Sequence, residues 1–106
     1  MKLTLIQNKV DELYDFAIEH YPQGDNRPEQ LRKFADAAFN SADDKELHER
    51  LLYLQSFVHK GMKRFADIRL KATPDSNYTD SDLNDKLQTL STELHSLIED
   101  MLKAKP

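Results

Sequence analysis

The sequence predicts an all-α fold, a small up-and-down four-helix bundle that forms one domain over residues 1–106. Four segments carry apolar residues at steps of three and four, and none shows the alternation typical of a half-buried strand. Three stretches rich in turn and capping residues separate them, at 21–28, 40–43 and 73–80. The chain has only two glycines, whereas many-turned β folds use glycine heavily.

The first two helices are predicted over residues 3–20 and 28–40. Pro22 ends the first, because proline cannot continue a helix. Asp25 or Asn26 would cap the second, and Pro28 suits its first turn. The inward stripe of the first helix contains six apolar residues: Leu3, Ile6, Val10, Leu13, Phe16 and Ala17.

The third and fourth helices are predicted over residues 43–72 and 80–103, and both carry heptad-like seams. Ser41 or Asp43 would cap the third, and Thr79 or Ser81 the fourth. The third seam runs from Leu47 through Leu51, Leu54, Val58, Gly61, Phe65 and Ile68 to Ala72; the fourth consists of Leu83, Leu87, Leu90, Leu94, Leu97 and Met101. The simplest arrangement is a long antiparallel helix 3/helix 4 hairpin with the shorter helices packed on it.

The predicted helix lengths give the first indication of function. Helices 3 and 4 would be roughly 45 Å and 35 Å long, against about 27 Å and 20 Å for helices 1 and 2. The hairpin tip would therefore be the least covered region, and its apolar residues would form an exposed patch. Alternatively, helix 1 could slide along the hairpin, or the long helices could bend over the core, and so cover the tip.

We therefore interpret the chain as a non-enzymatic protein-interaction module of the adaptor, regulator, chaperone or immunity type, acting through helix 3 and the hairpin tip. The partner would be another protein or a second copy in a homodimer. Four apolar residues are the predicted anchors: Phe65, Ile68, Leu70 and Leu83. Four basic residues would steer an acidic partner: Lys63, Arg64, Arg69 and Lys71.

Composition argues against most chemistry. The chain has no cysteine, which excludes disulfides, thiolate metal sites and cysteine nucleophiles, and its glycines are too few for a phosphate cradle. No catalytic residue, metal site, cofactor or small-molecule substrate is indicated. The N-terminal apolar run is too short for a signal peptide or a membrane span, so we expect a cytoplasmic protein with no membrane contact.

Two further hypotheses concern the third helix. The string from Phe57 to Lys63 resembles the histidine-containing phosphotransfer domain, an intracellular four-helix bundle. The resemblance implies that His59 accepts phosphate from a response-regulator aspartate and that Lys63 balances the added charge. Otherwise His59 is a boundary residue, and Gly61 lets helix 4 approach closely or permits a slight bend. The third hypothesis is nucleic-acid binding by the basic strip, which the sequence pI of about 5.5 disfavours.

Overall fold

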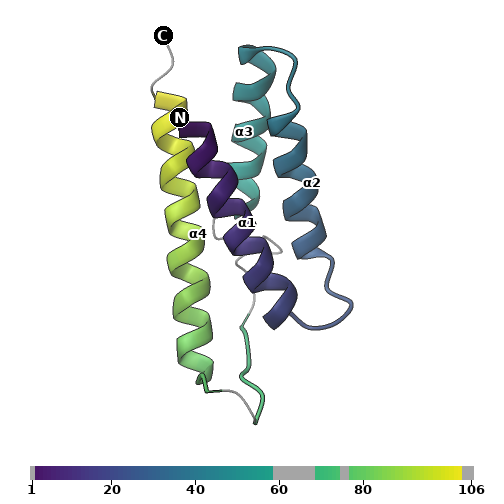
Figure 1. Cartoon of the computed structure of the whole chain (residues 1–106), viewed down its shortest axis with the longest axis vertical. Helices are drawn as coiled ribbons and strands as arrows, with labels where there is room; N and C mark the ends of the chain where they lie inside the picture. Colours follow the sequence, from purple (N-terminus) through teal and green to yellow (C-terminus); the bar gives the residue numbers. More distant parts are fainter. Residues whose placement is uncertain (1, 59–68, 75–76, 104–106) are drawn as a thin grey trace.

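The computed structural model describes residues 2–58, 69–74 and 77–103, and this part of the chain forms four helices. They are α1 (Lys2–His20), α2 (Arg27–Phe39), α3 (Asp44–Val58) and α4 (Asp80–Lys103). Figure 1 shows them side by side, with consecutive helices running in opposite directions. Each helix packs against two others, in the ring α1, α2, α3, α4 and back to α1. The predicted all-helical fold is confirmed, and the described residues contain no strand.

Local capping explains where α2 and α3 begin. Asn26 is the N-cap residue of α2, and Arg27 is the first residue of the helix. The carboxylate Oδ1 of Asp25 accepts a hydrogen bond from the backbone N–H of Arg27 at 2.9 Å. At the start of α3, Oδ1 of Asp43 accepts from the N–H of Glu46 at 2.8 Å, and the Glu46 carboxylate accepts from the N–H of Ala42 at 2.8 Å. These bonds satisfy the N–H groups of Arg27 and Glu46, which the first helical turn leaves without an intrahelical acceptor, and the N–H of Ala42 just before α3.

The third helix departs from its prediction. It was expected to continue to residue 72, but α3 ends at Val58 within the described residues, and residues 69–73 lie outside any helix. The prediction is therefore wrong for residues 69–72, and residues 59–68 lie outside the described part. Residues 69–72 thus form part of a non-helical segment before α4, where the long hairpin was expected to be helical.

Side chains of α4 hold this non-helical segment in place. The amide of Asn84 accepts a hydrogen bond from the backbone N–H of Leu70 at 2.8 Å and donates one to its carbonyl oxygen at 2.9 Å. The Asp80 carboxylate accepts from the N–H of Ala72 at 2.6 Å. These bonds satisfy backbone groups that would otherwise need helical partners, so the segment can run along the start of α4.

Of the two predicted caps of the fourth helix, Thr79 is the one that precedes α4, and it forms a capping box with Asp82. The hydroxyl of Thr79 accepts a hydrogen bond from the N–H of Asp82 at 3.1 Å, and the Asp82 carboxylate accepts from the N–H of Thr79 at 3.0 Å. The reciprocal pair fixes the first turn of α4. None of the described helices is both long enough and apolar enough to cross a membrane.

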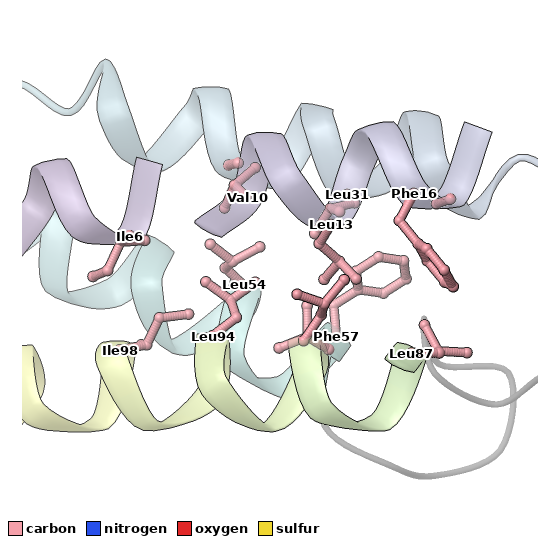
Figure 2. Close-up of a cluster of buried hydrophobic side chains, with 14 of the residues drawn as sticks. Ile6, Val10, Leu13, Phe16, Leu31, Leu54, Phe57, Leu87, Leu94 and Ile98 are labelled. Carbon is pink, nitrogen blue, oxygen red and sulfur yellow. The ribbon is translucent and has the colours of Figure 1, made fainter. Parts of the chain in front are cut away.

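The core lies between the four helices. Figure 2 shows side chains of α1 pointing toward those of α4, with Leu54 and Phe57 of α3 between them. Phe16 and Leu87 lie at the end of this layer nearest the start of α4 (Figure 2). The residues with no exposed surface in this core are Ile6, Val10, Leu13, Ala17, Leu31, Ala35, Leu54, Leu87, Leu94 and Ile98.

Candidate functional site

A groove lies between the second half of α1 and the beginning of α4, and residues 77 and 78 line it as well. Its volume is about 650 Å³, within the range of roughly 300–1,000 Å³ found for ligand sites. The groove is open to solvent. Its lining residues are Glu12, Asp15, Phe16, Glu19, His20, Asn77, Tyr78, Asp82, Leu83, Asp85 and Lys86.

The groove results from the different lengths of two neighbouring helices. In Figure 1 the beginning of α4 extends past the end of α1. The chain leaves α1 after His20 and turns away at residues 22–24, where Gly24 has the positive φ of 93° that glycine adopts without strain. The last turns of α1 therefore form one wall and the first turns of α4 the other.

The floor of the groove is aromatic. The ring of Phe16 is 4.7 Å from the ring of His20, centroid to centroid, and His20 meets Tyr78 edge to face at 6.3 Å. Phe16 is buried in the core, whereas Tyr78 is 56% exposed. The three rings thus connect the hydrophobic core to the surface.

The walls of the groove are acidic. Five carboxylates line it, against one lysine and one histidine. Glu12 accepts a bond from Lys9 at 3.0 Å, and Asp82 serves in the capping box of α4. Asp15 and Asp85 form no ion pair with any described residue. The groove therefore carries excess negative charge and retains carboxylates able to accept new donors.

The carboxylates of the groove are spread over two helices. Within the described ranges, no group of three histidine or acidic side chains lies close enough together to hold a metal ion. Three of the acids lie on the α1 wall and two on the α4 wall.

The predicted site residues fall into three groups. Leu70 and Leu83 are buried in the core, 1% and 3% exposed, so these two leucines hold the bundle together and do not offer an exposed anchor. Arg69 and Lys71 are exposed on the segment before α4. The remaining predicted anchors and basic residues, with the phosphotransfer histidine, lie outside the described residues: Phe65, Ile68, Lys63, Arg64 and His59.

The acidic walls were missed at the sequence level, although a signal was present. Glu12, Asp15 and Glu19 recur at steps of three and four, which places them on one face of α1. Asp82 and Asp85 have the same spacing on α4. Either set alone is typical of a solvated helix face, and only the packing of α1 against α4 brings the two together across an aromatic floor.

Comparison of the chain with protein-family models, with curated proteins and with solved structures found no match. We therefore infer function from the groove itself.

Proposed function

We propose that the chain is a non-enzymatic protein-binding module and that the groove between α1 and α4 receives its partner. The observation that carries this proposal is the exposed ring of Tyr78, which packs on His20 in a groove between two walls of charged side chains. Protein interfaces use such an arrangement, with a large aromatic anchor at the centre and a polar rim around it.

The exposure of Tyr78 supports this assignment. More than half of its surface is accessible, although it packs edge to face on His20. A tyrosine offers a large contact area with few rotatable bonds, so its burial by a partner costs little conformational entropy. The groove lies near the start of the fourth helix, where the tip of the hairpin was predicted. Its proposed anchor is Tyr78, whereas the predicted anchors Leu70 and Leu83 are buried.

The phosphotransfer and nucleic-acid hypotheses stay predictions. Both depend mainly on residues 59–68, which lie outside the described part of the chain. The exposed pair Arg69 and Lys71 is the described portion of the proposed basic strip.

Site-specific photo-cross-linking tests the proposed function. A benzophenone amino acid would replace Asp85 in the groove or, as a matched control, Asp100 at the other end of α4; both positions are exposed acids on the same helix. Irradiation of cells expressing the full chain should give a discrete cross-linked protein, or a cross-linked second copy, from position 85 and not from position 100. Equal cross-linking from both positions, or none from either, would overturn the proposal.

A further inference from the structure

We propose that the groove binds a basic segment of a partner protein, with an arginine or lysine side chain lying on the aromatic floor between the two acidic walls. This inference rests on the proposed function and specifies its partner by chemical class.

The first argument is charge complementarity. The α1 wall carries three carboxylates and the α4 wall two, and Lys86 and His20 are the basic residues among the lining side chains. A peptide lying along the groove would therefore meet acceptors on both sides. Basic side chains spaced along such a peptide could each contact a different carboxylate, which matches acids spread over two helices.

The second argument is the aromatic floor. The face of an aromatic ring attracts an ammonium or guanidinium group within about 6 Å of its centroid. An acidic surface without rings would attract any cation through long-range charge, whereas the exposed ring of Tyr78 also provides contact for the apolar stem of a long basic side chain. The combination favours lysine or arginine over a small inorganic cation.

The third argument is an arginine site of the same composition within this chain. The guanidinium of Arg32 on α2 lies 4.8 Å from the ring centroid of Tyr14 on α1. The same group donates to the Asp11 carboxylate at 2.8 Å and lies 3.8 Å from the carboxylate of Asp36. One tyrosine ring and two carboxylates thus hold a guanidinium between two helices. The groove offers Tyr78 with Asp15 and Asp85, and no basic side chain of the described residues forms an ion pair with these two acids.

Titration with defined peptides tests the inference. The probe is a short amidated peptide of alternating arginine and glycine, compared with a matched peptide of alternating glutamate and glycine. The 15N-labelled full chain would be titrated with each peptide and followed by NMR. We expect the arginine peptide to shift the amide signals of groove residues such as His20, Tyr78 and Lys86, and the glutamate peptide to leave them unchanged.

Two pairs of variants separate a specific site from general attraction to an acidic protein. Asp15→Asn with Asp85→Asn removes two groove carboxylates, and Glu49→Gln with Asp100→Asn removes two exposed carboxylates elsewhere, so the net charge changes equally. The groove pair should lower the affinity for the arginine peptide about two- to tenfold, and the control pair should lower it much less. Tyr78→Ala should weaken binding about two- to fivefold, whereas Tyr78→Phe, which keeps the ring, should bind nearly as the native chain does.

Equal losses for the two charge pairs, or peptide-induced shifts scattered over the whole surface, would overturn the inference. So would a cross-linked partner, captured at position 85, whose contacting segment contains no lysine or arginine. In that last case the proposed function would stand, because the groove would still bind a protein. Absence of cross-linking at position 85 would instead remove the proposed function, whatever the peptides do.

Discussion

Replacing Asn84 by alanine should destabilise the bundle by detaching the segment that precedes α4. The substitution removes two hydrogen bonds to the backbone of Leu70, at 2.8 and 2.9 Å, and one to the carbonyl of Asp80 at 2.7 Å. Leu70 is 1% exposed, so its backbone groups would lose their partners in a largely buried position. At about 1 kcal/mol for each of the two bonds to Leu70, and more if water cannot replace them, the loss is about 2–3 kcal/mol.

Part of this loss is offset, because alanine is a better helix former than asparagine by about 0.5 kcal/mol. The net expectation is therefore about 2 kcal/mol, a shift of about 1 M in the urea midpoint. Asn8→Ala is the matched control, since Asn8 is exposed within α1 and gains the same helix propensity. Hydrogen exchange gives a local measurement, and the Leu70 amide should exchange roughly 30-fold faster in the Asn84 variant. If both variants unfold at the same urea concentration and Leu70 exchanges at the native rate, Asn84 does not hold this segment.

Three further predictions concern the core and one surface pair. Ser91 is 4% exposed, and its hydroxyl has no hydrogen-bond partner among the described residues. Ser91→Ala should therefore raise the free energy of unfolding, measured by urea titration, by about 1 kcal/mol. A lower free energy of unfolding in this variant would show that the hydroxyl has a partner. The side-chain amide of Gln55 donates to the Glu99 carboxylate at 2.7 Å and lowers the pKa of Glu99. NMR titration should therefore show the pKa of Glu99 rising in Gln55→Leu. The native chain should lose this contribution to stability as pH falls through the lowered pKa, and an unchanged pKa would refute the assignment. Leu94→Ala should lower the free energy of unfolding by about 2–5 kcal/mol, because Leu94 is fully buried. Leu5→Ala, at a 52% exposed position, should lower it far less in the same urea assay. Equal losses of stability in the two variants would contradict the core assignment.

The proposed groove and the folding of the segment before α4 are physically linked. Asp80, Asp82 and Asn84 all lie in the first turns of α4, where they bind the backbone of residues 70, 72 and 79. Because this segment leads directly to residues 77 and 78, its attachment to α4 helps to place Tyr78 beside His20. Variants of Asn84 should therefore weaken binding of the arginine peptide and also destabilise the fold. The peptide experiment uses Asp15 and Asp85 because these two residues do not hold the segment in place.

The sequence predicted the helices where the signal was local. Apolar spacing gave the inward face of α1, and that of α4 as far as Leu94, although Ile98 is fully buried where Leu97 and Met101 were predicted to face inward. The cap of α4 was predicted at Thr79 or Ser81, and Thr79 caps it together with Asp82, three residues later. The predicted third helix shows where such a signal ends. Ala72 continues the regular apolar seam and Leu70 flanks it, yet both lie outside a helix, and side chains of α4 bind their backbone.

By itself, then, the sequence determined the helical class, the faces that become buried and the caps, because each depends on residues within one or two turns of each other. Tertiary structure decided the path of residues 69–73 and the groove. The bonds of Asn84 reach a residue fourteen positions earlier, and the two acidic walls come from helices at opposite ends of the chain. The spacing of residues along one helix cannot indicate which surface of another helix will lie across a groove from them. The position of the groove depends on how far α4 extends past α1 when the two helices pack together.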